Sequence, residues 1–313
     1  MKETLSLREE LGKALCEIGS LDENVVILSP DVGKSTKALE FNKKYPERYI
    51  CTGISEQNTI GLAAGLAYMG WTPIVAGYAM FVGGKAWEPF RNSVCYPGLN
   101  VKIVATHGGI NVGQDGVTHQ CIEDIALMRA IPGLTILAAS SPEEVLPLLK
   151  LSLSVKTPVY IRLEREASHD FSKKRSTYRI GGSTRLKAGS DATIFAIGGM
   201  VRKAQEAAAI MEEEKISVAV VNIYSIKPID KFAIIKAANN TRCVVTAEDH
   251  NCLGGLGSAV AEVLVQTKSI PLEMVAVKDT FAESGNPQDL FKKYHLTTKD
   301  IVAAVRKGLK RAA

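Results

Sequence analysis

Short apolar runs that alternate with helical patterns limit how this chain can fold more than any other feature. The runs are rich in β-branched residues, and helical patterns fill most of the gaps between them. Such alternation is typical of parallel strands with helices on both faces of the sheet. In the first half of the chain the predicted strands are Val25–Leu28, Thr72–Val75, Val101–Val104, Leu134–Leu137 and Val159–Ile161. The sequence therefore predicts a doubly wound α/β domain.

A polar stretch from about Ser168 to Ser190 interrupts this alternation and has the composition of a linker or a surface hairpin. After it the alternation resumes, with predicted strands Ala192–Ile197, Val218–Val221, Cys243–Ala247 and Leu272–Val277 and predicted helices Val201–Glu214, Lys231–Ala238 and Gly257–Gln266. We therefore expect two doubly wound α/β domains, residues 1–170 and a smaller one of residues 189–313, joined by a linker of residues 171–188.

Length and composition fit this plan and disfavour several other classes of protein. The 313 residues, 46% of them apolar and 23% charged, suffice for two domains with buried cores. No apolar run reaches the roughly 20 residues of a membrane span, and the N-terminal MKETLSLREE lacks a secretory signal, so we expect a cytoplasmic protein without membrane contact. The net charge is only +5 and the basic clusters lack interleaved aromatic residues, so we expect no nucleic-acid partner.

The six cysteines are scattered, without a CxxC pair or histidines at metal-ligand spacing. Reduced thiols are therefore expected rather than disulfides, and no metal ligands are assigned to this chain. The first helix has readable ends: Ser6-Leu7-Arg8-Glu9 fits a capping box at its start, and Gly19 is placed to end it.

Glu56 stands directly ahead of a very apolar helix, in the string GISEQNTIGLAAGLAYMGW. The helix has no polar face, so we expect it to be buried on all sides. A glutamate in a first helical turn can simply stabilise the helix dipole. Here, however, Ser55, Gln57 and Asn58 add polar groups at the end of a strand, which is where ligands bind in open α/β sheets. Glu56 is therefore a candidate site residue.

A second candidate site is the glycine-rich loop ATHGGINVGQDGVTHQ, residues 105–120, which follows a predicted strand. Its glycines let the backbone pass close to a ligand. His107, Asp115 and His119 could be unrelated loop residues, but their clustering favours a site for a polyol or a carbonyl group.

Two further motifs have competing interpretations. Arg162 and Arg165 lie at the end of a strand in YIRLERE, where they could form surface ion pairs with neighbouring glutamates or hold a substrate phosphate. Gly254-Gly255-Leu256-Gly257 lies between a strand and a helix, but it does not meet the dinucleotide pattern G-x-G-x-x-G. Tight packing of the helix on the sheet is the better account of these glycines.

The ordered set of these motifs resembles the C-terminal half of transketolase and of 1-deoxyxylulose-5-phosphate synthase. The matching strings are GISEQN with its apolar helix, AMF after the next strand, GQDGVTHQ and the strand-end arginine. The resemblance covers essentially the whole chain. It implies a pyrimidine-binding domain followed by a transketolase C-terminal domain, as in enzymes that use thiamine diphosphate.

The resemblance also implies roles for individual residues. Glu56 would hydrogen-bond N1′ of the cofactor's aminopyrimidine ring, and Tyr78 and Phe81 would flank that ring. Asp115 and His119 would contact the hydroxyls and the carbonyl end of a sugar. The residues implied to hold the substrate phosphate are His107, Arg165, Arg8 and Ser35.

The implied reaction is the transfer of a two-carbon ketol unit from a ketose phosphate to an aldose phosphate. Full-length transketolases bind Mg²⁺ and the diphosphate through an N-terminal domain with a Gly-Asp-Gly motif, and no such string occurs in this chain. We therefore expect a separate N-terminal subunit that provides most of the contacts to Mg²⁺. We also expect an α₂β₂ assembly and pairing of this chain with a second copy. Gly83-Gly84 replace a third aromatic residue of many transketolases and leave the acceptor specificity open.

Three alternatives remain at this stage. A β subunit of a 2-oxo-acid dehydrogenase would share Glu56, but Thr118-His119-Gln120 together with Arg165 favours a phosphorylated sugar. A deoxyxylulose-phosphate synthase would be expected to carry its N-terminal half in the same chain. A binding or regulatory subunit without catalytic activity is disfavoured because Glu56 and the candidate sugar residues occur together.

Overall fold

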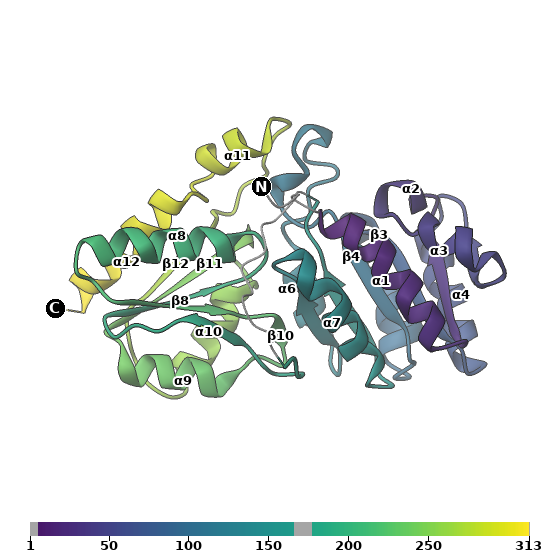
Figure 1. The fold of residues 1–313 in the computed structure, drawn as a ribbon, viewed down its shortest axis with the longest axis horizontal. Helices are drawn as coiled ribbons and strands as arrows, with labels where there is room; N and C mark the ends of the chain where they lie inside the picture. The colour runs from purple at the N-terminus through teal and green to yellow at the C-terminus, as the bar shows by residue number, and fades with distance from the viewer. Residues whose placement is uncertain (1–5, 166–176, 313) are drawn as a thin grey trace.

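Two α/β domains lie side by side in the computed structural model, which describes residues 6–165 and 177–312 (Figure 1). The predicted fold class is confirmed. The first domain contains a seven-stranded sheet in the order β10-β5-β6-β4-β3-β1-β2. Its strands are parallel except β10, which comes from the second half of the chain and runs antiparallel to β5.

The elements of the first domain begin with α1 (Leu7–Leu21), β1 (Val25–Ser29), α2 (Gly33–Thr36), α3 (Leu39–Lys44), η1 (Pro46–Arg48), β2 (Tyr49–Cys51), α4 (Glu56–Tyr68) and β3 (Thr72–Tyr78). They continue with two π-helical segments, η2 (Ala79–Lys85) and η3 (Phe90–Cys95), that flank α5 (Trp87–Pro89). The remaining elements are β4 (Lys102–Thr106), η4 (Ile110–Asp115), α6 (Asp124–Arg129), β5 (Thr135–Ala138), α7 (Pro142–Leu153) and β6 (Val159–Arg162).

The second domain has a five-stranded sheet in the order β12-β11-β8-β9-β7, with β7 antiparallel at the edge. Its α8 packs against α12, and its α9 packs against α10. Its elements are β7 (Thr184–Lys187), β8 (Ala192–Ala196), α8 (Met200–Glu213), β9 (Val218–Asn222), α9 (Lys231–Asn240), β11 (Cys243–Asn251), α10 (Leu256–Leu264), β12 (Leu272–Val277), α11 (Pro287–Lys293) and α12 (Thr298–Arg311). Between β9 and α9 the chain contributes β10 (Ser225–Lys227) to the sheet of the first domain.

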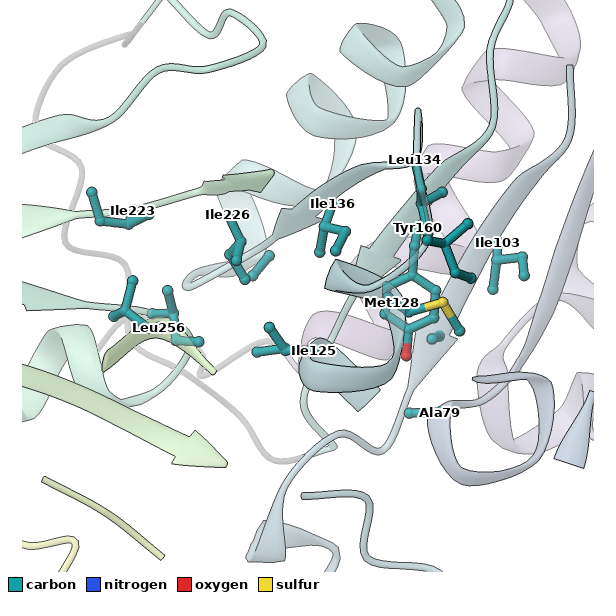
Figure 2. Close-up of a cluster of buried hydrophobic side chains, with 14 of the residues drawn as sticks. Ala79, Ile103, Ile125, Met128, Leu134, Ile136, Tyr160, Ile223, Ile226 and Leu256 are labelled. Atoms are coloured by element: carbon teal, nitrogen blue, oxygen red, sulfur yellow. The ribbon is translucent and has the colours of Figure 1, made fainter. Parts of the chain in front are cut away.

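One hydrophobic core runs across the boundary between the domains. Ile223, Ile226 and Leu256 from the second half of the chain belong to the same cluster of buried side chains as Ile125 and Ile136 from the first (Figure 2). Burial of apolar side chains across this boundary stabilises the two domains as one unit.

The sequence predicted most strands but missed three that are short or lie at sheet edges, β2, β7 and β10. The predicted capping box is confirmed, since the Ser6 side chain accepts the backbone N–H of Glu9 and the Glu9 side chain accepts that of Ser6. The prediction that Gly19 ends the first helix is wrong, because α1 continues to Leu21. A Cβ at Gly19 would lie 2.4 Å from the ring of Phe41, so this glycine makes room for packing.

The prediction that the helix after Glu56 is buried on all sides is also wrong for this chain. Gly61, Leu62, Gly65 and Tyr68 share one face of α4 and are exposed. A Cβ at Gly61 or Gly65 would meet nothing within 4 Å. No element among the described residues covers this face, although the helix is apolar all round.

The predicted linker falls partly outside the described residues, which do not include 166–176. Its C-terminal end contains β7, which pairs with β9 in the second sheet. The helices among the described residues include none that is long and apolar enough to cross a membrane.

Candidate active site

The predicted site residues follow the carboxyl ends of neighbouring strands in the first sheet. Parallel strands bring these ends to one edge, where ligands of open α/β sheets bind. The N-terminus of α1 lies at the same edge, because α1 runs back toward the amino end of β1. The residues concerned are Arg8 in α1, Ser35 after β1, Glu56 after β2, Tyr78 at the end of β3, Phe81 in η2, His107, Asp115 and His119 after β4, and Arg165 after β6.

Glu56 is the first residue of α4 and is only 3% exposed. Its Oε2 accepts a hydrogen bond from Nζ of Lys85 at 2.6 Å. Lys85 ends η2, and its side chain is half-exposed. Such a charged partner offsets the cost of burying a carboxylate. Sequence reasoning missed Lys85, although it follows the aromatic pair by only a few residues.

Four rings form a cluster at the ends of β3 and β4. The rings of Tyr78 and Phe81 are stacked, with centroids 6.1 Å apart and an interplanar angle of 26°. The imidazole of His107 lies 3.9 Å from the Tyr78 ring, and that of His119 lies edge-on to Phe81 at 5.3 Å. The structure therefore brings together four residues that the sequence suggested separately.

His107 is buried and has a left-handed backbone conformation, with φ of 63°. Such a conformation is costly for a residue other than glycine and is often found at functional sites. Burial, together with the positive charges of Arg8 and Arg165 and the nearby His119, lowers the pKa of His107 from 6.5 to about 3. His107 is therefore neutral at pH 7, with Nδ1 hydrogen-bonded to the hydroxyl of Thr106 at 2.8 Å.

Arg8 and Ser35 also lie together. The guanidinium of Arg8 donates to the carbonyl oxygen of Ser35 at 3.2 Å. The Nε of Arg8 is buried and has no hydrogen-bond partner in the described part of the chain. A buried donor without a partner is uncommon, and a phosphate oxygen would satisfy it.

Arg165 pairs with Asp115 rather than standing free. Its NH1 donates to Oδ2 of Asp115 at 2.9 Å and to the carbonyl oxygen of Val112 at 2.6 Å. Both charged side chains are partly exposed, so a ligand could reach them. Arg162, the other arginine of this strand end, is fully buried at the boundary between the domains, where its Nε donates to Asp124 at 3.0 Å. Neither the surface ion pair nor the phosphate interpretation applies to Arg162.

The arrangement fits an aminopyrimidine ring at one end and a phosphorylated sugar at the other. Glu56 offers a buried acceptor, and Tyr78 and Phe81 offer flat apolar walls. Arg8, with its unsatisfied Nε, and Arg165 supply positive charge near His107. Among residues 6–165 and 177–312, no three histidine, cysteine, aspartate or glutamate side chains are grouped as metal ligands.

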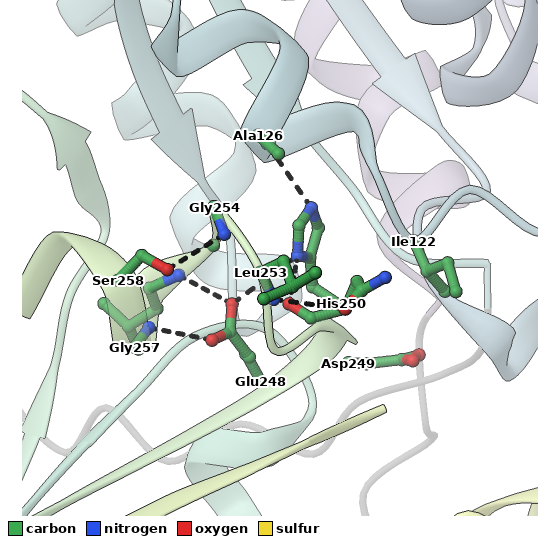
Figure 3. Close-up of polar contacts among 12 residues, drawn as sticks. Ile122, Ala126, Glu248, Asp249, His250, Leu253, Gly254, Gly257 and Ser258 are labelled. Carbon is green, nitrogen blue, oxygen red and sulfur yellow. Dashed lines mark hydrogen bonds and ion pairs between the residues drawn. The ribbon is translucent and has the colours of Figure 1, made fainter. Parts of the chain in front are cut away.

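The glycines after β11 serve packing, as the sequence suggested. A Cβ at Gly257 would lie 2.7 Å from the sulfur of Met274. The carboxylate of Glu248 accepts the backbone N–H groups of Leu256 and Gly257 at the start of α10, at 2.6 and 2.8 Å (Figure 3). A carboxylate at a helix N-terminus is stabilising, and here it occupies the place that a dinucleotide's phosphates would need.

Comparisons with known proteins agree with this geometry. Family models match the transketolase pyrimidine-binding domain over residues 3–169 and the transketolase C-terminal domain over residues 181–301. A Methanocaldococcus jannaschii protein named for a transketolase C-terminal section is 40% identical over 308 residues, which cover 97% of this chain and 96% of that protein.

A 6-deoxy-6-sulfo-D-fructose transketolase subunit from a Clostridium species is 36% identical, with 97% of this chain and 95% of that protein aligned. A solved structure described as a split-gene transketolase in an inactive β4 tetramer superposes with a TM-score of 0.93 at 45% identity, covering 99% of this chain and 100% of that one. Matches of this extent show that the chain belongs to the transketolase family, as a pyrimidine-binding domain followed by a transketolase C-terminal domain.

Proposed function

We propose that this chain is the C-terminal subunit of a transketolase that moves a two-carbon ketol unit from a ketose phosphate to an aldose phosphate. The observation that carries the proposal is the grouping of the Tyr78, Phe81, His107 and His119 rings beside two arginines. The transketolase family depends on thiamine diphosphate, and the grouping supports a cofactor ring at one end and a sugar phosphate at the other.

In this proposal each residue of the chain has a limited task. Glu56 binds N1′ of the aminopyrimidine, and Tyr78 and Phe81 hold the ring from its sides. Held by these residues, thiamine diphosphate would supply the electron sink that cleavage of a ketose carbon–carbon bond requires. His107, neutral at pH 7, can accept or donate one hydrogen bond to the substrate.

The remaining residues orient the sugar. Asp115 and His119 bind hydroxyl and carbonyl groups, and the Asp115–Arg165 ion pair opens so that Arg165 contacts the phosphate together with Arg8 and Ser35. Positioning of this kind converts binding energy into rate.

We further propose a separate N-terminal subunit, which binds Mg²⁺ and the diphosphate, and an α₂β₂ assembly. Two similar proteins of nearly the same length are named as a C-terminal section and as a subunit of transketolases. The 45% identical structure is described as a tetramer of β chains, which supports pairing of this chain with a second copy. We propose the uncovered apolar face of α4 as the surface through which the copies associate.

Calorimetric titration tests the cofactor and the partner together. Thiamine diphosphate with Mg²⁺ is titrated into this chain alone and into its mixture with a candidate N-terminal subunit. Binding in the mixture only, followed by ketol transfer between phosphorylated sugars, is the expected result. Tight binding to the chain alone would contradict the partner's role, and binding without any ketol transfer would contradict the proposed reaction.

Glu56→Gln tests the cofactor contact. The variant should retain its fold and assembly but slow exchange of the cofactor's C2 proton by about a hundredfold or more, since a positioned acid–base group contributes that much. Glu47→Gln, at an exposed carboxylate paired with Arg48, is the matched control and should leave the exchange rate unchanged. Equal rates for wild type and Glu56→Gln would remove Glu56 from the site.

A further inference from the structure

The glycine-rich loop of residues 105–120 carries His107, Asp115 and His119, which are proposed to bind the substrate. Hydrogen bonds connect this loop to the C-terminal domain. The side-chain amide of Gln120 donates to the carbonyl oxygen of Glu283 at 3.0 Å. The hydroxyl of Ser284 donates to the carbonyl oxygen of Gln114. The second domain therefore packs against the loop of the proposed substrate site and supports its conformation.

Asp249, near the end of β11, makes a fully buried contact with this loop. Its Oδ1 accepts the backbone N–H of Ile110 at 2.9 Å, and its Oδ2 accepts that of Asn111 at 3.3 Å. Gly109 precedes them with φ of 87°, and a Cβ there would lie 2.1 Å from Oδ2 of Asp249. Only glycine allows the carboxylate to lie so close. The shape of the loop and the place of Asp249 therefore depend on each other.

Asn111 transmits this contact to the charged end of the site. Its Nδ2 donates to Oε2 of Glu164 at 2.8 Å, and its Oδ1 accepts the backbone N–H of Arg165 at 3.4 Å. The Arg165 guanidinium in turn binds the carbonyl oxygen of Val112 and the carboxylate of Asp115. A shift of residues 110–111 would therefore also move the proposed phosphate-binding arginine.

A buried arginine balances the charge around Asp249. The NH2 of Arg162 donates to the backbone carbonyl oxygen of Asp249 at 2.8 Å, its Nε binds Asp124, and its NH1 lies 3.9 Å from Glu164. A buried carboxylate is retained only where hydrogen bonds and opposite charge offset its desolvation. Asp249 has both, and its hydrogen bonds go to the loop of the other domain.

We propose that Asp249 is a positioning residue for the reaction: its carboxylate fixes the loop so that His107, Asp115 and His119 face the sugar. The inference rests on the proposed function for the identity of what the loop binds. It gives the C-terminal domain a definite task in substrate binding. Glu56, Tyr78 and Phe81 lie on other segments, and the last two contact the loop through the His107 and His119 rings, so Asp249 should affect substrate binding much more than cofactor binding.

Asp249→Asn tests the inference in the complex with the N-terminal subunit. The amide keeps the shape of the side chain but places an N–H₂ group against a backbone N–H. We expect the KM for a ketose phosphate to rise by about tenfold or more, while the dissociation constant of thiamine diphosphate changes by less than about twofold.

Glu248→Gln is the matched control. Glu248 is the preceding residue on β11 and is equally buried, but its carboxylate is directed to α10 rather than to the loop (Figure 3). Both variants should lower the melting temperature, and only Asp249→Asn should raise the KM. Equal effects of the two variants on the KM, or none for Asp249→Asn, would overturn the positioning role. If Asp249→Asn does not fold, Gly109→Ala is the substitute, because a Cβ there would lie 2.1 Å from Oδ2 of Asp249 and push the carboxylate off the loop, and it is expected to raise the KM in the same way.

Hydrogen exchange in this chain separates the inference from the proposed function. Asp249→Asn should speed exchange of the Ile110 and Asn111 backbone amides by about tenfold or more, whereas Glu248→Gln should not. If wild-type complex shows no ketol transfer, the proposed function fails, and these exchange rates still decide whether Asp249 holds the loop. Unchanged exchange in Asp249→Asn would overturn the inference even in an active enzyme.

Discussion

Glu56 keeps a counter-ion in this chain although its carboxylate is almost fully buried. Lys85 supplies it across 2.6 Å, from the segment that also carries Phe81. A cofactor nitrogen that binds Glu56 would have to share the carboxylate with this ammonium group or displace it. The same ion pair therefore stabilises the folded chain and competes with the cofactor for Glu56.

Lys85→Met should destabilise the cofactor-free chain by about 1–3 kcal/mol, because it leaves a buried carboxylate without its donor. The measurement is urea unfolding of the wild type and the variant. Lys13→Met, in the exposed pair with Glu10 at 3.3 Å, is the control and should cost no more than about 1 kcal/mol. Equal losses for the two variants would show that the Glu56 pair is no stronger than a surface pair.

Glu144 predicts a pH dependence of stability that can be measured in this chain alone. It is buried at the boundary between the domains, where it accepts hydrogen bonds from Ser140 and Asn222. Burial raises the pKa of Glu144 from 4.5 to about 7, and its hydrogen bonds oppose this only in part. Between these two pH values the folded chain therefore holds a proton that the unfolded chain has released.

Glu144 should consequently lower the free energy of unfolding as the pH rises from 4.5 to about 7, and it should add no further change above that. In Glu144→Gln the slope of the free energy of unfolding against pH should be less negative over this range, by up to about 1.4 kcal/mol per pH unit. Denaturant unfolding at several pH values measures the difference between the two proteins. Parallel curves would mean that Glu144 is ionised in the folded chain throughout this range.

How far the site could be predicted depended on the range of the interactions. Tyr78 and His107 follow strands whose apolar runs are visible in the sequence, so their common edge could be foreseen, whereas the short strand β2 before Glu56 was missed. Lys85 and Asp249 could not be foreseen, because each acts through a contact with a distant segment. Nothing in the local pattern around Asp249 indicates that it binds residues 110–111.

Among the elements, β10 links the two domains most directly. It leaves the second domain after β9, pairs with β5 in the first sheet and returns to α9. Sequence patterns could not reveal it, since three residues are too few for a period and the pairing partner lies far away in the chain. The longer strands of both sheets were predicted because their apolar runs are continuous.

Ile226→Ala tests whether β10 joins the two domains in one folding unit. Ile226 is 1% exposed in the shared core, so the variant should lose about 2–5 kcal/mol of stability. Ile210→Ala, at a residue 38% exposed on α8, is the matched control and should lose less than about 1 kcal/mol.

Two signals follow this unfolding. Both tryptophans, Trp71 and Trp87, lie in the first domain, whereas circular dichroism reports on both domains. The two signals should give coincident transitions that shift together in Ile226→Ala. Separate transitions, with only the circular dichroism curve shifted, would contradict a single unit.

On the scale of the whole molecule, the apolar face of α4 is an exposed surface that we expect a partner to cover. Gly61, Leu62, Gly65 and Tyr68 lie along it without cover from the rest of the described chain. The wrong prediction of a fully buried helix has a simple cause: composition shows that a helix is to be buried but not by which chain.

Leu62→Asp should leave the fold intact and weaken association with a second copy by about tenfold or more, because a charge would be buried at the interface. Sedimentation velocity over a range of concentrations measures the effect. Leu21→Asp, at an exposed leucine at the end of α1, is the control and should leave association unchanged. Unchanged association in Leu62→Asp would assign this face to another partner.

Because β10 belongs to the sheet of the first domain, it also limits where a gene for such a protein can be divided. A product that starts after the first domain would carry β10 as an unpaired edge, together with the exposed half of the shared core. Edges and apolar surfaces of this kind promote aggregation. A gene for such a protein should therefore be split or fused at points outside the region that encodes these two domains, so that both domains stay in one polypeptide.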